Sequence, residues 1–481
     1  YYNAFNIASD GLRARAGTLS SGREWFLEWK TIDGVNLASH TIPQIDVLLQ
    51  GMCNKKTLIE LIKHFIVFEN DGGKLTKKLA AYHQYYAVKK AVDKTVQAAL
   101  PKGDKKIGVI WHTQGSGKSL TMAFYTGKLV ISQELENPTI VVLTDRNDLD
   151  DQLFNTFSGI ECLREKPVQA TSKEKLKELL RRASGGIIFT TIQKFGTENG
   201  NLDILSDRSN IIVAADEAHR TQYGFKAKVT NDQIKYGLAK YLRDALPNAS
   251  FIGFTGTPID FEDRSTRNVF GDYIHVYDIE QAVNDERTVK IYYESRLAKL
   301  NITQELAKLD KEFDEVTESE EIENKNKLKG EWSRLESIVG SDNRIKQIAK
   351  DIVNHFEQRN NVMGGKGMIV CMSRRICVQL YNEIQKIKPE WANNEDDKGL
   401  LKVIMTGSAA DGPEWQQHIR NKERRKHLAD IFKDTNSEFK LAIVRDMWLT
   451  GFDAPSLHTL YVDKPMKGHG LMQAIARVNR V

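Results

Sequence analysis

Short apolar runs rich in β-branched residues recur along the chain and are separated by amphipathic stretches with helical spacing. The runs fall at 107–111, 139–144, 186–191, 211–217 and 250–256 in the first half, and at 367–373, 401–407, 441–446 and 459–465 in the second. Continuous apolar strands that alternate with helices are typical of parallel sheets covered on both faces. The pattern therefore predicts an α/β protein with two parallel-sheet units in tandem.

A highly charged stretch at residues 301–340 separates the two predicted units. It holds 11 acidic and 6 basic residues, which leaves 53 acidic and 63 basic residues in the rest of the chain. We expect an exposed helix or a flexible insert in this stretch. The mildly basic remainder suits a polyanionic partner, although many metabolic enzymes have a similar balance.

Length and composition narrow the class of protein. A chain of 481 residues is too long for one ordinary core. It has no apolar run of about 18 residues, which argues against a membrane span. Its four cysteines form no C-x-x-C pair, which suits a reducing cytoplasm. Because the sequence starts at Tyr1 without an initiator Met and stops within a predicted helix, we expect an internal piece of a longer protein.

The segment WHTQGSGKSLTMAF, residues 111–124, lies between a predicted strand and a predicted helix, as a phosphate-binding P-loop does. Its glycines would let successive backbone N–H groups face phosphate oxygens, its lysine would reach the β- and γ-phosphates, and its serine would bind Mg²⁺. The candidate nucleotide-binding residues are Gln114, Gly115, Ser116, Gly117, Lys118 and Ser119. His112 stands where the pattern has its first glycine, so a glycine-rich turn that binds no ligand is the alternative.

An acidic motif, IIVAADEAHR at residues 211–220, also places polar side chains at the end of a predicted strand. Its apolar strand delivers Asp216 and Glu217 at the carboxyl end, where ligands bind in parallel sheets. Asp216 is placed to hold Mg²⁺ through water, and Glu217 to orient or deprotonate an attacking water. The two motifs together predict hydrolysis of a magnesium nucleotide, with Lys118 and Glu217 as catalytic residues.

This combination of motifs resembles that of the superfamily 2 helicases and translocases. SFIGFTGTPI, residues 250–259, is similar to their motif III, which implies that Thr255, Gly256 and Thr257 relay the nucleotide state between two RecA-like lobes. QAIARVNR, residues 473–480, is similar to motif VI. The resemblance implies that Arg477 and Arg480 stabilise charge on the γ-phosphate from the second lobe.

The motifs resemble most closely the motor subunit of type I restriction enzymes, over nearly the whole chain. The stretches that carry the likeness are LTDRNDLDDQLF, FTTIQKF, DEAHRTQYG, GFTGTPI and LTGFDAPSLHTLYVDKPMKGHGLMQAIARVNR. By this resemblance AYHQYYAVKKAV, residues 81–92, reads adenine through Gln84, with Ala81 where an arginine is expected. Asp453 of the GFDAP stretch would be a further nucleotide-binding residue.

The resemblance implies an ATP-driven translocase of double-stranded DNA, with ATP and Mg²⁺ as cofactors and methyltransferase and specificity subunits as partners. It implies that residues 1–30 end a nuclease domain, 31–77 are a connector, 78–300 form the first RecA-like lobe, 301–344 are the charged insert and 345–481 form the second lobe. The nuclease carboxylates would then lie upstream of this chain. A D…E-x-K pattern formed by Asp10, Glu28 and Lys30 is the alternative nuclease site.

Translocation needs a grip on DNA that does not depend on base sequence, and phosphate contacts supply it. We expect these contacts in loops of both lobes, from Arg146, Thr191, Lys194, Lys464, Lys467 and His469. The basic cluster at residues 420–427 is either a further DNA contact or a solvated helix face. A strand-separating helicase, a chromatin-type remodeller and a non-enzymatic DNA-binding scaffold stay open as alternative functions.

Overall fold

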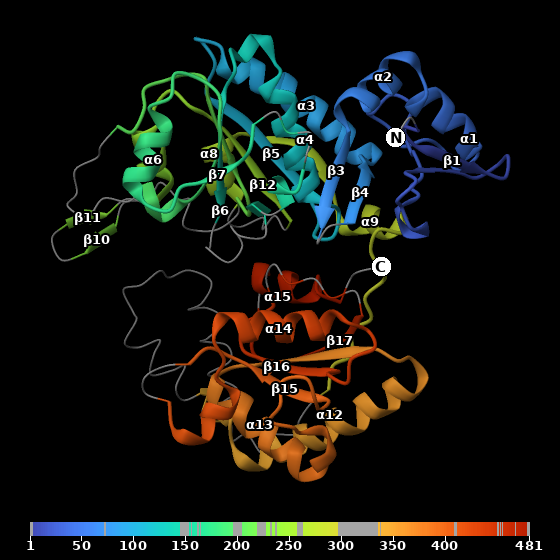
Figure 1. Cartoon of the computed structure of the whole chain (residues 1–481), viewed down its shortest axis with the longest axis vertical. Coiled ribbons are helices and arrows are strands. Elements are labelled where there is room, and N and C mark those ends of the chain that lie inside the picture. The colour runs from blue at the N-terminus through green and yellow to red at the C-terminus, as the bar shows by residue number, and fades with distance from the viewer. Residues whose placement is uncertain are drawn as a thin grey trace. The chain divides into compact units, whose positions relative to one another are not determined.

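The computed structural model describes residues 3–478 except 72–73, 145–152, 155, 161–162, 164, 196–203, 219–227, 231–232, 236–237, 257–262, 297–334, 337, 408–410, 450–451, 453, 455 and 467. The chain divides into two compact units, Tyr1–Val289 and Lys290–Arg480. Each unit is built around its own parallel sheet (Figure 1).

Unit 1 is organised around a seven-stranded sheet in which every paired strand runs parallel. In spatial order its strands are β13 (Tyr273–Tyr277), β5 (Lys106–His112), β12 (Ser250–Thr255), β9 (Ile211–Ala215), β6 (Thr139–Thr144), β8 (Ile187–Thr191) and β7 (Val168–Gln169). Its helices are α3 (Tyr82–Ala99), α4 (Lys118–Val130), α6 (Lys173–Leu180), α7 (Leu238–Ala245), α8 (Asp263–Phe270) and α9 (Ile279–Asn284). A small antiparallel pair, β10 (Lys228–Thr230) and β11 (Gln233–Lys235), lies outside this sheet.

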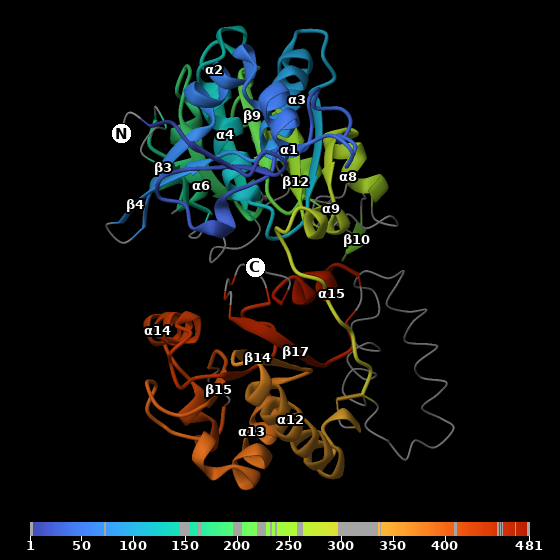
Figure 2. The same ribbon diagram turned by 90° about the vertical axis from the view of Figure 1, so that its right-hand side faces the viewer.

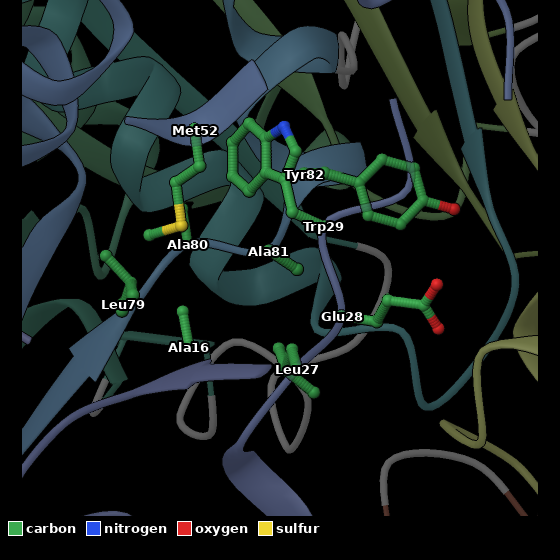
Figure 3. Close-up of a pocket in the computed structure, with 9 residues that line it drawn as sticks. All are labelled: Ala16, Leu27, Glu28, Trp29, Met52, Leu79, Ala80, Ala81 and Tyr82. Carbon is green, nitrogen blue, oxygen red and sulfur yellow. The ribbon is translucent and has the colours of Figure 1, made fainter. Parts of the chain in front are cut away.

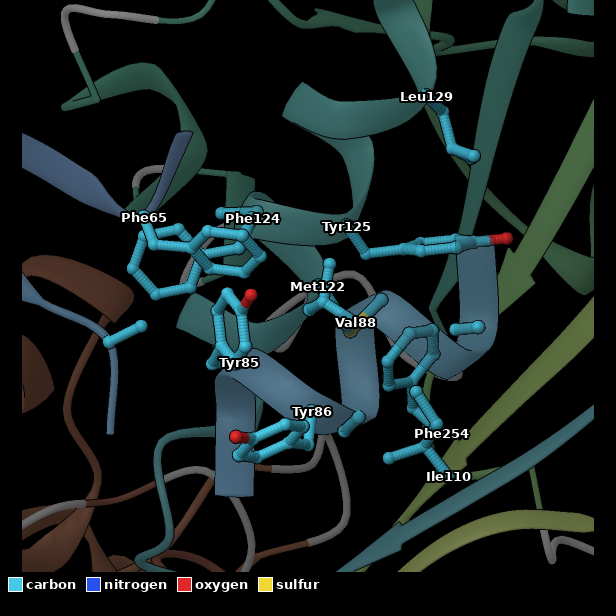
Figure 4. Close-up of a cluster of buried hydrophobic side chains, with 14 of the residues drawn as sticks. Phe65, Tyr85, Tyr86, Val88, Ile110, Met122, Phe124, Tyr125, Leu129 and Phe254 are labelled. Carbon is cyan, nitrogen blue, oxygen red and sulfur yellow. The ribbon is translucent and has the colours of Figure 1, made fainter. Parts of the chain in front are cut away.

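Both faces of this sheet are covered, and its central strands β12, β9, β6 and β8 are buried at every position. Along β6, Ile140 and Val142 belong to one core cluster, whereas Val141 and Leu143 belong to another, as the two-residue period of a strand requires. Residues of α3 and α4 belong to the first cluster, and residues of α6, α7 and α8 belong to the second. Figure 2 shows α3, α4 and α8 around strands β9 and β12. Close-packed rings dominate the first cluster, where the centroids of Phe65 and Tyr85 lie 4.8 Å apart (Figure 4).

Residues 3–79 pack against the same unit through short elements. These are the hairpin of β1 (Asn6–Ser9) and β2 (Ala14–Gly17), α1 (Gln44–Val47) with a π-helical turn at Leu48–Met52, α2 (Lys55–His64), and the antiparallel pair of β3 (Ile66–Asp71) and β4 (Lys74–Leu79). Trp29 is 3% exposed, and its ring centroid lies 5.8 Å from that of Tyr85 and 5.9 Å from that of Tyr86 on α3. Aromatic burial therefore fixes this N-terminal part on α3.

Unit 2 has a four-stranded parallel sheet in the order β15 (Leu401–Ile404), β16 (Leu441–Val444), β14 (Lys366–Cys371) and β17 (Leu457–Asp463). Helices α12 (Asp342–Val362) and α13 (Arg374–Ile387) supply the core on one face. Helices α14 (Lys422–Lys433) and α15 (Gly468–Ile475) supply the core on the other.

The predicted α/β class with two parallel-sheet units is confirmed, and each of the apolar runs named above contains a strand. The sequence reasoning missed the edge strands β13 and β7, which are partly exposed. Most of the charged stretch 301–340 lies outside the described residues, and the finer domain boundaries stay predictions. No helix among the described residues is long and apolar enough to cross a membrane.

Candidate functional site

The predicted phosphate loop joins β5 to α4 in unit 1. Gly115 and Gly117 both have left-handed backbones, with φ values of 84° and 83°, and Gly117 is the residue from which α4 starts. A Cβ on Gly117 would lie 2.6 Å from Nε2 of Gln84, so conformation and space both call for glycine. The N–H groups in the first turn of α4 have no hydrogen-bond partners within the helix, so they can donate to an anion. The positive end of the helix dipole also favours an anion at this position.

Hydrogen bonds from neighbouring side chains fix the loop. Nε2 of His83 donates to the Ser116 carbonyl at 3.1 Å, and Nε2 of Gln84 donates to the Gly117 carbonyl at 3.0 Å. The Ser116 hydroxyl donates to the Thr113 carbonyl at 2.5 Å. Two of these donors come from the start of α3, so α3 holds the shape of the loop. The amide of Gln84 also accepts from the Ala81 N–H at 2.9 Å, and its predicted contact with a base stays a prediction.

The residue in place of the first P-loop glycine is part of a buried histidine cluster. His112 ends β5 with no exposed surface, and its Nε2 shares a hydrogen bond of 3.0 Å with Nδ1 of His275 on β13. The His83 ring stacks on Tyr277 with 3.9 Å between centroids and lies 5.4 Å from the His112 ring. We call His83, His112 and His275 the histidine cluster.

Burial disfavours the charged imidazole in all three members of the histidine cluster. It lowers the pKa of His83 and of His112 well below the usual value and that of His275 to about 4. The cluster is therefore neutral at physiological pH. Sequence reasoning found no role for His83 or His275, because nothing local in the strand YIHVY points to the loop it supports.

The acidic motif meets the loop at the carboxyl end of β9. Oε1 of Glu217 lies 3.6 Å from Nζ of Lys118, and each of these side chains is 12% exposed. Glu217 has a left-handed backbone with φ of 49°, and its N–H donates to Oδ1 of Asp216 at 3.0 Å. Backbone bonds from Asp216 to Leu143 and from Ala218 to Phe254 hold the turn between β6 and β12. The predicted lysine and glutamate are thus brought together.

Motif III reaches the same lysine. A Cβ on Gly256 would lie 2.5 Å from Nζ of Lys118 and 2.8 Å from Cγ of Gln114, so this glycine leaves room for the lysine ammonium. Thr255 is 1% exposed at the end of β12. Thr257 lies outside the described residues. The loop after β12 therefore borders the phosphate loop directly.

The alternative nuclease triplet is engaged elsewhere. Nζ of Lys30 lies 2.9 Å from Oδ1 of Asp285 and 3.7 Å from Oε2 of Glu28. Asp10 is exposed, and its Oδ1 accepts from the N–H groups of its own turn. No group of three or more His, Cys, Asp or Glu side chains among the described residues is arranged to hold a metal ion. Lys30 is accounted for as the partner of a buried carboxylate.

A small pocket marks where the N-terminal residues meet α3. It is lined by Ala16, Leu27, Glu28, Trp29, Met52, Leu79, Ala80, Ala81 and Tyr82 (Figure 3). All of these except Glu28 and the hydroxyl of Tyr82 are apolar or present apolar surface. Burial raises the pKa of the Glu28 carboxyl. The pocket is a gap in the packing between the N-terminal part and α3.

Two of the predicted DNA-contact residues that the structure describes, Lys194 and Lys464, already have partners within the protein. Nζ of Lys194 donates to the Ala170 carbonyl at 2.5 Å, and Nζ of Lys464 lies 2.5 Å from Oδ1 of Asp446. Thr191 is 4% exposed at the end of β8. Arg146 and Lys467 lie outside the described residues, and for His469 only the helical backbone of α15 is described. The DNA-binding role of all six stays a prediction.

Part of the basic cluster at 420–427 pairs with a neighbouring acidic loop. Arg420 and Arg424 each pair with a different oxygen of Asp396, at 2.6 and 2.8 Å. Nε2 of His427 lies 2.7 Å from Oδ1 of Asp397. Because these side chains have partners within unit 2, we interpret residues 420–427 as part of the fold of this unit and not as a DNA contact.

Arg477 of motif VI is 4% exposed and held within unit 2. Its Nη1 donates to the Phe452 carbonyl, and its Nε donates to the Gln473 carbonyl at 3.2 Å. Arg480 and Asp453 lie outside the described residues. The roles predicted for these three residues in nucleotide hydrolysis stay predictions.

The fold and site define the class of protein: an α/β protein with two parallel-sheet units and a glycine-rich loop between a strand and a helix, as in P-loop proteins. The SWI2/SNF2 ATPase family model matches residues 83–326, about half of the chain, and a model described as type I restriction enzyme subunit R domain 3 matches residues 377–481. The chain belongs to the SWI2/SNF2 ATPase family. The predicted resemblance to the motor subunit of type I restriction enzymes is confirmed.

Proteins named as endonuclease subunits of type I restriction enzymes are similar to this chain over its whole length. The HindI endonuclease subunit of a type I restriction enzyme from Haemophilus influenzae is 50% identical over 100% of this chain and 46% of its own length. The MjaIXP endonuclease subunit from Methanocaldococcus jannaschii is 41% identical, with the same two coverages. The chain thus spans less than half the length of these relatives.

A solved structure has the same fold. A fragment of an HsdR subunit of a type I restriction enzyme from Vibrio vulnificus YJ016 has a TM-score of 0.51 at 15% identity and covers 99% of this chain and 72% of its own. The type ISP restriction-modification enzyme LlaBIII bound to DNA also has a TM-score of 0.51, at 13% identity over 85% of this chain and 27% of its own.

Proposed function

We propose that this chain is the ATP-driven motor of a type I restriction enzyme and moves double-stranded DNA. The observation that carries the proposal is the gathering of Lys118, Glu217 and Gly256 around a loop whose two glycines adopt left-handed backbones. A turn that binds no ligand would need neither a largely buried lysine against a glutamate nor a further glycine in contact with that lysine. The ATPase family membership supports the same function.

The residues at the loop fit a magnesium nucleotide. Ser119 in the first turn of α4 and Asp216 at the end of β9 supply hydroxyl and carboxylate oxygens, the ligands that Mg²⁺ prefers. When bound, the ion would neutralise charge on the β- and γ-phosphates. The unpaired N–H groups at the start of α4 add donors for phosphate oxygens.

The protein's own residues would supply the remaining steps. The Lys118 ammonium, now 3.6 Å from Glu217, would bind the β- and γ-phosphates and leave the glutamate to orient the attacking water. Gly256, against Lys118, would sense that change and pass it along β12. Arg477 and Arg480 are proposed to stabilise charge on the γ-phosphate.

The DNA part of the proposal rests on the relatives. The HindI and MjaIXP proteins are named endonuclease subunits of type I restriction enzymes, and LlaBIII was solved bound to DNA. We propose that Arg146, Thr191, Lys194, Lys464 and Lys467 contact DNA phosphates. Methyltransferase and specificity subunits are the proposed partners, and a nuclease domain of the whole protein would cut the DNA.

Phosphate release with and without linear duplex DNA tests the ATPase proposal. The native chain should be stimulated tenfold or more, and Lys118→Ala should abolish the stimulation. Lys102→Ala, at an exposed lysine in the turn before β5, is the matched control and should behave like the native chain. Native-like stimulation in Lys118→Ala would refute the proposed site.

The type of motor needs a separate assay. A translocase should displace the third strand of a triplex in the presence of ATP and leave the underlying duplex paired. Separation of a short duplex would instead favour a helicase of the same superfamily.

A further inference from the structure

The short segment 285–288, which follows α9 at the end of unit 1, belongs to none of the motifs. Its backbone is tied back to α9, because the N–H groups of Arg287 and Thr288 donate to the Ala282 carbonyl at 2.9 and 3.3 Å. Asp285 accepts from the hydroxyls of Tyr82 and Tyr277 at 2.7 and 2.8 Å. The segment is therefore fixed by contacts on several sides.

Thr288 lies directly against the phosphate loop. Its Cγ2 would be 3.4 Å from a Cβ placed on Gly115, one of the two left-handed glycines. Its side chain is 3% exposed, and its hydroxyl has no hydrogen-bond partner among the described residues. A buried hydroxyl without a partner is destabilising, so a threonine at this position calls for an explanation.

The residue before Thr288 brings a positive charge close to the loop. The guanidinium of the adjacent Arg287 lies over the Trp25 ring at 5.0 Å. Burial is the main cause that lowers the pKa of His83, whose Nε2 supports the loop at Ser116, and the positive charge of Arg287 lowers it further. A threonine hydroxyl can donate to a phosphate oxygen, and a positive charge that acts on the side chains of the loop would favour that acceptor.

We propose that Thr288 is a further nucleotide-binding residue, whose hydroxyl donates a hydrogen bond to a phosphate oxygen of the nucleoside triphosphate held at Gly115–Ser119. This inference rests on the proposed ATP site and extends it to a residue at the end of unit 1. The unpaired hydroxyl is then explained, because its partner is the ligand. A rotation of about 120° around χ1 of Thr288 moves the hydroxyl into the place of the methyl group and the methyl group into that of the Cβ hydrogen, so the oxygen can reach the position beside Gly115 without a backbone shift.

Calorimetric titration of the native chain and its variants with ATP in the presence of Mg²⁺ tests the inference. Thr288→Val keeps the shape and removes the donor, so the Kd for ATP should rise about tenfold or more. Thr288→Ser keeps the donor and should stay within about twofold of the native value. Ser250→Ala removes another buried hydroxyl without a partner, at the amino end of β12, and is the matched control.

Thermal unfolding without nucleotide separates binding from structure. Because Thr288→Val replaces an unsatisfied hydroxyl by a methyl group, its Tm should equal or exceed the native one. An unchanged Kd in Thr288→Val, with ATP binding in the native chain and loss in Lys118→Ala, would overturn the inference and leave the ATP site intact. Absence of ATP binding in the native chain would overturn both.

Discussion

The histidine cluster makes unit 1 sensitive to acid. His83, His112 and His275 are held neutral behind the phosphate loop, with the pKa of His275 lowered to about 4. An unfolded histidine takes up a proton near pH 6.5. Between pH 6.5 and 4 the unfolded chain therefore binds more protons than the folded one, and the free energy of unfolding falls as the pH falls.

The expected size follows from these pKa differences. On going from pH 7.5 to 5.5, each histidine that stays neutral in the folded state lowers the free energy of unfolding by about 1 kcal/mol. Three such residues together lower it by about 3 to 4 kcal/mol, which is a large part of the stability of a typical domain. His418 in unit 2, whose pKa burial lowers to about 4, adds to the loss in the whole chain.

Urea unfolding at pH 7.5 and 5.5 measures the effect, and a variant isolates one histidine from the others. His83→Gln keeps an N–H that can donate to the Ser116 carbonyl but cannot take up a proton. The free energy of unfolding should fall by about 1 kcal/mol less in this variant than in the native chain over the same pH change. His40→Gln, at an exposed histidine, controls for the loss of an imidazole as such.

The test compares the change in the free energy of unfolding between the two pH values, and the stability of the variant at a single pH does not decide it. If native and His83→Gln chains lose the same free energy between pH 7.5 and 5.5, His83 is already protonated in the folded protein. The interpretation of the cluster as a neutral support for the loop would then be wrong.

Three further substitutions test the site and its alternatives. Gly256→Ala should weaken ATP binding at least fivefold, because the new Cβ would lie 2.5 Å from Nζ of Lys118. The Tm should change little, since Nζ is the mobile end of a side chain and can move away. Titration with ATP measures the affinity, and a native value would contradict this prediction. Lys30→Met should lower the free energy of unfolding by about 1–3 kcal/mol in urea, because it leaves the Asp285 carboxylate, 7% exposed, without its cation. Loss of Mg²⁺-dependent DNA cutting in Lys30→Met would instead support a nuclease role. Arg424→Gln should leave the affinity for duplex DNA within about twofold in a salt titration, since this arginine pairs with Asp396, and a smaller salt dependence would place the basic cluster on DNA.

Local patterns in the sequence were enough to predict the buried strands of the two sheets and to locate the two candidate nucleotide motifs. The apolar runs of β5, β6, β9 and β12 are buried on both faces, so their composition alone distinguishes them from surface strands. The spacing of Gly115, Gly117 and Lys118 encodes the loop, because the two glycines adopt the left-handed conformation that other residues resist. Strand ends in a parallel sheet then place Glu217 beside the loop.

Tertiary structure decided what surrounds those motifs. His112 and His275 meet because β13 pairs with β5, an edge pairing between segments 163 residues apart that no local pattern encodes. The partner of Lys30 is Asp285, and the neighbour of Gly115 is Thr288, each far away along the chain. A short stretch of sequence specifies backbone conformation and the face that is buried, but the partners of a buried polar group depend on which distant segments fold against it.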